Sequence, residues 1–91
     1  MGETRIIRVR YWAAARAAAG TASEDLPVTG PLSLADVRRE VLALHPGTRL
    51  ADVLGACSVL IGDVPVGTRS DDEVQVEPGS SVEFLPPFAG G

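Results

Sequence analysis

Hydrophobic and polar residues alternate from Arg5 to Trp12, at the start of the chain. This period of two puts apolar side chains on one face and arginines on the other, which predicts a half-buried strand. The alanine-rich stretch 13–19 predicts a short helix that ends at Gly20. The segment 24–29 predicts a second strand, and Pro27 indicates a sheet edge because proline lacks an amide donor. We therefore expect the chain to open with a hairpin-like pair of strands.

The main helix is expected over residues 34–44, where apolar residues recur at steps of three and four. Ser33 and Asp36 form a capping-box pattern at its start. The Pro-Gly pair at 46–47 ends it. The predicted buried stripe of this helix consists of Leu34, Val37, Val41 and Leu44.

The second half of the chain predicts one more short helix and the remaining strands. The helix is expected over 49–54, closed by Gly55. The strands are expected over 57–61, 64–66 and 81–85. Alternation in the last strand directs Val82 and Phe84 inward and leaves Leu85 outward.

The order of these elements is strand, strand, helix, strand, strand. One long helix covers one face of a sheet of four to five strands, so we expect a two-layer α+β domain whose other sheet face stays open. The 91 residues fit a single small domain, with the folded part over 1–85. A composition of 45% hydrophobic and 22% charged residues is typical of globular proteins.

Charge and side-chain chemistry exclude several classes of function. Eight basic against twelve acidic residues give a formal net charge of -4, which argues against a nucleic-acid partner. The single cysteine excludes an internal disulfide framework and a cysteine-built metal site, and we expect no bound metal. With one histidine as well, the chain does not fit a self-contained hydrolase. No apolar run approaches the roughly 18 residues of a membrane helix, so we expect a cytoplasmic protein without membrane contact.

The last six residues carry the clearest functional signal. Two prolines end the last strand and hold the chain extended. The aromatic Phe88 is unusual for a disordered terminus. A final Gly-Gly pair can thread a channel too narrow for any Cβ and present the terminal carboxylate. We therefore expect an extended, flexible tail that consists of Pro86, Pro87, Phe88, Ala89, Gly90 and Gly91.

The terminal carboxylate is a poor electrophile and must be activated before it can react. Adenylation by ATP is the simplest route. The sequence contains neither G-x-G-x-x-G nor G-x-x-x-x-G-K-[ST], the glycine-rich loops that bind phosphates. We therefore expect no bound cofactor, and ATP to be used in trans by an activating partner.

The segment 84–91, FLPPFAGG, resembles the C-terminus of the MoaD-type small subunits of molybdopterin synthase, which belong to the MoaD/ThiS family of ubiquitin-like sulfur carriers. The segment 9–20, VRYWAAARAAAG, is similar to the first strand and helix of that family. The resemblance spans nearly the whole chain. It implies a ubiquitin-like β-grasp fold, a mixed sheet with one main helix on one face.

The resemblance also implies a reaction sequence. A ubiquitin-activating-type enzyme, MoeB-type, adenylates Gly91, and a persulfide sulfur converts the adenylate into a covalent thiocarboxylate. The tail then enters the MoaE-type large subunit, where the sulfur passes to precursor Z, a cyclic pyranopterin monophosphate. Because a thiocarboxylate is ionised at neutral pH, its sulfur is nucleophilic without a local base.

Each tail residue takes a role in this scheme. Gly91 carries the sulfur and Gly90 permits threading. The residues that present and anchor the tail would be Pro86, Pro87, Phe88 and Ala89. Phe84 and Leu85 would lie near the surface that docks the large subunit.

Two alternatives remain open. The chain could carry sulfur for another pathway, such as thiamine, cysteine or tRNA thiolation, although the two prolines favour molybdopterin. It could instead be a protein-interaction module that uses the sheet face and never carries sulfur. That alternative predicts binding that survives loss of Gly90 and Gly91.

The remaining chemistry-bearing side chains are interpreted as structural. Cys57 is expected to be a small buried apolar residue. His45 is expected to be a cation at the end of a helix. The acidic run 71–73 is interpreted as a solvated loop. Arg8 and Arg10 are expected to form an exposed stripe, solvated or paired with Glu83.

Overall fold

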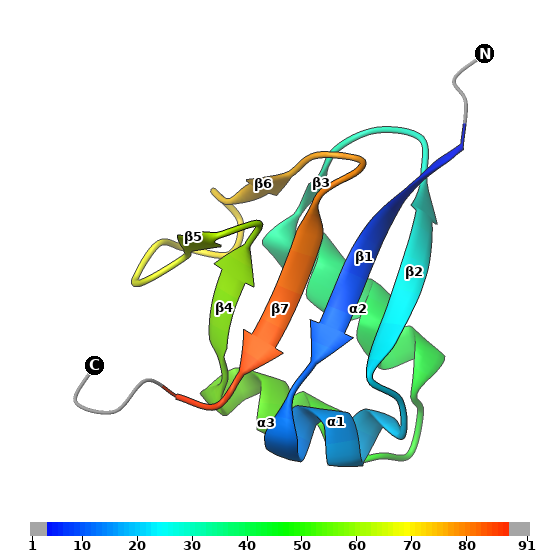
Figure 1. Ribbon diagram of the computed structural model, residues 1–91, viewed down its shortest axis with the longest axis vertical. Coiled ribbons are helices and arrows are strands. Elements are labelled where there is room, and N and C mark those ends of the chain that lie inside the picture. The colour runs from blue at the N-terminus through cyan, green and yellow to red at the C-terminus, as the bar shows by residue number, and fades with distance from the viewer. Residues whose placement is uncertain (1–3, 88–91) are drawn as a thin grey trace.

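The computed structural model describes residues 4–87, which form a main mixed sheet with helices at its back and at one end, and a second, two-stranded sheet (Figure 1). The elements are β1 (Arg5–Tyr11), α1 (Ala13–Ala19), β2 (Ser23–Val28), β3 (Leu32–Ser33), α2 (Leu34–Leu44), α3 (Leu50–Ala56), β4 (Ser58–Ile61), β5 (Val64–Pro65), β6 (Gln75–Val76) and β7 (Ser81–Leu85). Five strands form the main sheet in the order β2-β1-β7-β4-β5, and β3 pairs with β6. The predicted α+β class is confirmed.

The first and last long strands lie side by side in the centre of the sheet. β1 and β7 run parallel, with Val9 opposite Val82 and Tyr11 opposite Phe84. These four side chains are at most 2% exposed. Antiparallel strands flank the pair, β2 beside β1 and β4 beside β7. The core therefore joins the two ends of the chain.

The edge position predicted for the strand with Pro27 is confirmed. The Tyr11 N–H donates to the Ala22 carbonyl at 2.9 Å, which fixes the alternation of hydrogen-bonded pairs along β1 and β2. Pro27 stands opposite Ile6, between two such pairs. Its missing N–H therefore removes no hydrogen bond from the ladder.

Helix α2 has the bounds that its pattern predicts, and it crosses behind the sheet (Figure 1). The Ser33 hydroxyl accepts a hydrogen bond from the Asp36 N–H at 3.0 Å, so the predicted cap is present. Three of the four predicted buried positions are fully buried. Leu44 is the exception, at 52% exposed. It lies beside the edge strand β2, where no further strand of the described chain covers it.

Three short elements differ from the sequence-based expectation. Helix α3 continues through Gly55 to Ala56, because Gly55 keeps a negative φ and the extended backbone of Cys57 ends the helix. Strands β3 and β6 were not predicted. Each has two residues, which are too few to show a period of two, and they pair with Leu32 opposite Val76.

Ion pairs also differ from the expected pattern. Arg8 lies 2.9 Å from Asp25, its neighbour on β2, rather than pairing with Glu83. Asp71, expected to be solvated, lies with its Oδ2 2.7 Å from the Nε of Arg38. Arg38 also donates to the Leu54 carbonyl at 2.9 Å. A single α2 side chain thereby contacts both α3 and the loop before β6.

Truncation of the central aromatic residue of β7 tests this description of the core. Because Phe84 is fully buried, Phe84→Ala should lower the free energy of unfolding by about 3–5 kcal/mol. Val64→Ala, at a position 59% exposed, is the control and should change it by less than about 0.5 kcal/mol. Urea unfolding followed by circular dichroism measures both. Equal effects of the two substitutions would contradict the assignment of Phe84 to the core.

Candidate functional site

The candidate site is the point where the chain leaves the sheet towards its C-terminus. The last bond of the central pairing runs from the Trp12 N–H to the Phe84 carbonyl, at 3.0 Å. On the other side, Leu85 stands opposite Ser58 of β4. The exposed Pro86 and Pro87 follow directly. The sheet therefore holds the base of the tail up to its last strand residue.

Phe84 contributes to this site from the inside. Its ring stacks on Tyr11, with centroids 6.1 Å apart, and the Arg38 guanidinium lies 5.4 Å from the ring centroid. Because the side chain is 0% exposed, Phe84 offers no side-chain surface to a partner, and its place near a docking surface stays a prediction. The alternation of side chains along this strand predicts the burial of Phe84, because it directs Phe84 inward and Leu85 outward.

The outward residues form an apolar surface around the exit point. Leu85 is half-buried on the outer face of β7, and Leu60 of β4 lies on that face opposite Glu83. The Trp12 indole, 46% exposed, donates its Nε1–H to Glu83 Oε1 at 3.1 Å and so lies on the same face. We call Trp12, Leu60, Leu85, Pro86 and Pro87 the tail-exit surface.

A small apolar cavity adjoins this surface. Its volume is about 210 Å³, and it lies between the start of α1, the end of α3 and the two prolines. Its lining includes Trp12, Val53 and Cys57 besides Pro86 and Pro87. Apolar surface on both sides of the prolines makes the exit point suited to contact with another protein.

Sequence reasoning identified three members of the tail-exit surface and missed two. Leu85, Pro86 and Pro87 were predicted, whereas Trp12 and Leu60 were not. A large aromatic residue directly after an alternating strand was the available signal for Trp12. The predicted tail residues Phe88, Ala89, Gly90 and Gly91 lie outside the described residues.

The cysteine does not supply an activated nucleophile. Cys57 caps α3 rather than lying within a strand, and its thiol donates to the Val53 carbonyl at 3.2 Å. Burial raises the pKa of the Cys57 thiol, although Arg38 opposes this shift. The thiol therefore stays protonated at neutral pH, consistent with the predicted structural role, although Cys57 is only half-buried. Within residues 4–87 no cluster of metal-ligating side chains occurs.

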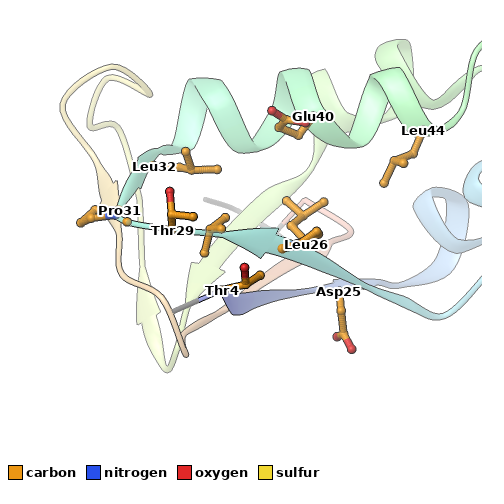
Figure 2. A pocket seen from close by; sticks show the side chains of 11 residues that line it. Thr4, Asp25, Leu26, Thr29, Pro31, Leu32, Glu40 and Leu44 are labelled. Atoms are coloured by element: carbon orange, nitrogen blue, oxygen red, sulfur yellow. The ribbon is translucent and has the colours of Figure 1, made fainter. Parts of the chain in front are cut away.

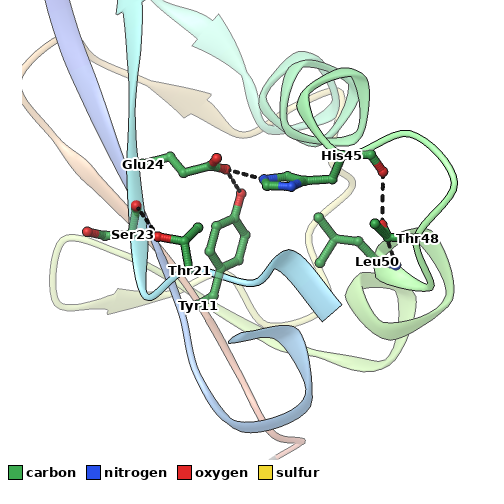
Figure 3. Close-up of polar contacts among 7 residues, drawn as sticks. All are labelled: Tyr11, Thr21, Ser23, Glu24, His45, Thr48 and Leu50. Carbon is green, nitrogen blue, oxygen red and sulfur yellow. Dashed lines mark hydrogen bonds and ion pairs between the residues drawn. The ribbon is translucent and has the colours of Figure 1, made fainter. Parts of the chain in front are cut away.

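A second polar cluster joins β1, β2 and the end of α2 (Figure 3). Glu24 Oε2 accepts a hydrogen bond from the Tyr11 hydroxyl at 2.7 Å and lies 2.7 Å from His45 Nε2. Burial, and the hydrogen bond to Glu24, raise the pKa of Tyr11. His45 thus has a carboxylate partner on β2, besides its expected place at the end of a helix. The cluster fixes the end of α2 to the sheet edge, and Tyr11 connects it to Phe84 by ring stacking.

Comparison with known proteins decides the family. The sequence pattern of the ThiS family matches residues 9–91, which is most of the chain. The chain belongs to the ThiS family.

None of the described helices is long and apolar enough to cross a membrane.

Relatives of this ThiS-family chain carry a consistent name. It is 31% identical over 91 residues, the full length of both chains, to the molybdopterin synthase sulfur carrier subunit of Aspergillus niger. It is also 31% identical to the protein of that name from Emericella nidulans, over 92% of this chain and 96% of the relative.

Solved structures confirm the β-grasp fold. The Haloferax volcanii HVO 2177 protein superimposes with a TM-score of 0.72 at 26% identity, over 97% of this chain and 88% of the other. Small archaeal modifier protein 1 from Methanosarcina acetivorans gives 0.72 at 22% identity, over 99% and 100%. Urm1 from Trypanosoma brucei gives 0.63 at 17% identity, over the full length of both chains. The mixed sheet with a main helix is thus the fold of this ubiquitin-like group.

The pH dependence of stability tests the cluster of Figure 3. A tyrosine with a raised pKa keeps its proton in the folded state, whereas the unfolded chain releases it above about pH 10. The resulting stability is present below pH 10 and is lost as the pH rises further. Tyr11→Phe should therefore flatten the fall in free energy of unfolding between about pH 9 and 12.

Urea unfolding across that pH range measures the effect. The chain has one tyrosine and no lysine, so few other groups titrate in this window. At pH 7 the variant should also lose about 1–2 kcal/mol, for the hydrogen bond to Glu24. An equally steep alkaline loss in Tyr11→Phe would contradict the assignment.

Proposed function

We propose that this chain is the sulfur carrier subunit of molybdopterin synthase. The observation that carries the proposal is the match to the ThiS family up to Gly91, together with the shared name of the full-length relatives. The geometry supports it because the central strand β7 ends directly before the tail. The reactive group is the terminal carboxylate of Gly91.

The proposed loading step takes place on a partner enzyme. The Gly91 carboxylate attacks the α-phosphate of ATP, and pyrophosphate leaves. The terminal sulfur of a persulfide then attacks the acyl-adenylate and displaces AMP. Reduction of the resulting S–S bond by a thiol releases the thiocarboxylate. This use of ATP in trans points to the cytoplasm as the compartment of the reaction.

The proposed donation step takes place on the large subunit. The tail enters that subunit, and the thiocarboxylate sulfur attacks a carbon of the pyranopterin precursor, where a C–S bond replaces a C–O bond. Water then hydrolyses the resulting thioester, which leaves the sulfur on the precursor for the dithiolene and returns Gly91 as a carboxylate. The tail-exit surface supports this docking because Leu85 and Trp12 expose apolar area beside the prolines. Gly90 would allow close approach of the large subunit's backbone.

The chain's own side chains position the tail rather than catalyse the reaction. Near the exit, Glu83 is held by the Trp12 indole, and the Cys57 thiol is protonated. The protonated thiol is therefore not set up for nucleophilic attack. The acid–base groups of the reaction are expected on the partner proteins.

Intact-mass measurement tests the proposed loading. Incubation with ATP, the activating enzyme and a persulfide donor should raise the mass by about 16 Da, the difference of sulfur over oxygen. Deletion of Gly91 should abolish the gain. A Cys57→Ala variant is the matched control and should still gain the sulfur. A mass gain that requires Cys57, or no gain at all, would contradict the proposal.

Binding to the large subunit tests the docking surface. Leu85→Asp and Leu60→Asp should each raise the dissociation constant at least about ten-fold, because each puts a charge into an apolar contact. Val64→Asp changes an equally apolar residue, 59% exposed, outside the surface and should bind like the unmodified chain.

Isothermal titration calorimetry provides the dissociation constants, and circular dichroism checks that each variant folds. A uniform effect of all three substitutions would indicate repulsion by net charge rather than a defined surface. Unchanged binding in both Leu85→Asp and Leu60→Asp would place the interface elsewhere. A chain that lacks Gly90 and Gly91 but still binds the large subunit would be compatible with a protein-interaction module, and the mass measurement tests that alternative separately.

A further inference from the structure

A second recognition feature lies at the edge of the sheet, two strands away from β7. There a groove with a volume of about 690 Å³ runs between β2 and α2 (Figure 2). Its floor includes Leu26 and Val28, and its wall on the helix side includes Glu40 and Leu44. None of its lining residues belongs to the tail-exit surface.

The strand beside the groove has unused hydrogen-bonding groups. Because Tyr11 and Ala22 form a hydrogen-bonded pair, the alternation points the backbone groups of Asp25 and Pro27 away from β1. Within residues 4–87 no backbone hydrogen bond uses these groups. β2 therefore offers one donor, from Asp25, and two acceptors, from Asp25 and Pro27, to an added strand.

The groove also offers apolar contacts. Leu44 is the one member of the α2 stripe that the core leaves exposed, at 52%. Figure 2 shows Leu44 extending from α2 towards β2, with Leu32 at the other end of the groove. A strand added to β2 would direct every second side chain into the space between these residues.

The charges around the groove restrict its occupant. The charged lining residues are Asp25 and Glu40, both acidic. Asp25 already pairs with Arg8 at 2.9 Å, so the negative charge left for a partner comes from Glu40 and from the net charge of -4 of the whole chain. A basic segment is therefore complementary to the site. A second copy of this chain is not, because it would bring further acidic groups and a second Pro27 that lacks a donor.

We propose that the groove binds an extended, basic segment of a partner protein, which pairs with β2 as an additional strand. Aliphatic side chains of the segment fill the space beside Leu44, and the alternate residues carry lysine or arginine. Main-chain hydrogen bonds to Asp25 and Pro27 fix its register. Because the groove lies away from the tail exit, such a partner can hold the carrier while the tail is engaged elsewhere.

A synthetic peptide tests the proposal with the intact chain. The probe is a peptide of about nine residues in which valine alternates with lysine, long enough to span one strand. Titration into ¹⁵N-labelled protein should shift the amide signals of Asp25, Leu32 and Leu44. A peptide with glutamate in place of lysine should bind at least about ten-fold more weakly.

Two matched pairs of changes separate strand addition from nonspecific attraction. In a peptide that pairs antiparallel to β2, valines that face the groove leave the lysine N–H groups facing β2, so N-methylation at lysines should abolish binding and N-methylation at valines should not. Parallel pairing would exchange these two results. In the protein, Leu44→Glu should weaken binding at least about ten-fold. Val64→Glu adds the same charge at another exposed position and should have little effect.

Three outcomes would overturn the proposal. One is equal binding of the two N-methylated peptides. Another is shifts confined to the tail-exit surface. The third is equal binding by Leu44→Glu and Val64→Glu. Concentration-dependent dimerisation of the chain through β2, measured by sedimentation, would assign the groove to a second copy instead.

Discussion

The parallel pairing of β1 with β7 is the interaction on which the rest of the structure depends. It joins the first and last long strands in the middle of the sheet. In this pairing the buried Val9 lies beside Val82, and the buried Tyr11 lies beside Phe84. Burial of apolar side chains is the largest favourable contribution to the folding free energy, and a small domain has few such side chains to bury. The last hydrogen bond of the pairing, from Trp12, also marks where the folded body ends and the tail begins.

This arrangement separates positioning from chemistry. A carrier whose reactive group is its own C-terminus needs no acid, base or metal ligand, which explains how a chain with one cysteine and one histidine can serve in sulfur transfer. The sheet presents two surfaces that do not overlap, the tail exit at β7 and the groove at β2. One surface suits the partner that uses the tail, and the other suits a partner that holds the body.

Sequence patterns predicted the elements that depend on interactions between near neighbours in the chain and that are long enough to show a period. The alternation over β1, the helical stripe of α2 and the edge position of Pro27 depend on backbone chemistry that acts within a few residues. Pairings between distant segments were not predictable in this way. Strand β6 exists only as the partner of β3, and Arg8 finds Asp25 only because β2 lies beside β1. The exposure of Leu44 depends on where α2 crosses the sheet. No local pattern contains these positions of distant segments.

The most direct test of the central claim is a single turnover of the thiocarboxylated chain with the large subunit and the pyranopterin precursor. Rapid quenching and intact-mass analysis would follow the protein while absorbance or chromatography follows the dithiolene product. The account predicts that the chain loses about 16 Da, sulfur exchanged for oxygen, in step with product formation. Product formed while the thiocarboxylate stays intact would contradict it.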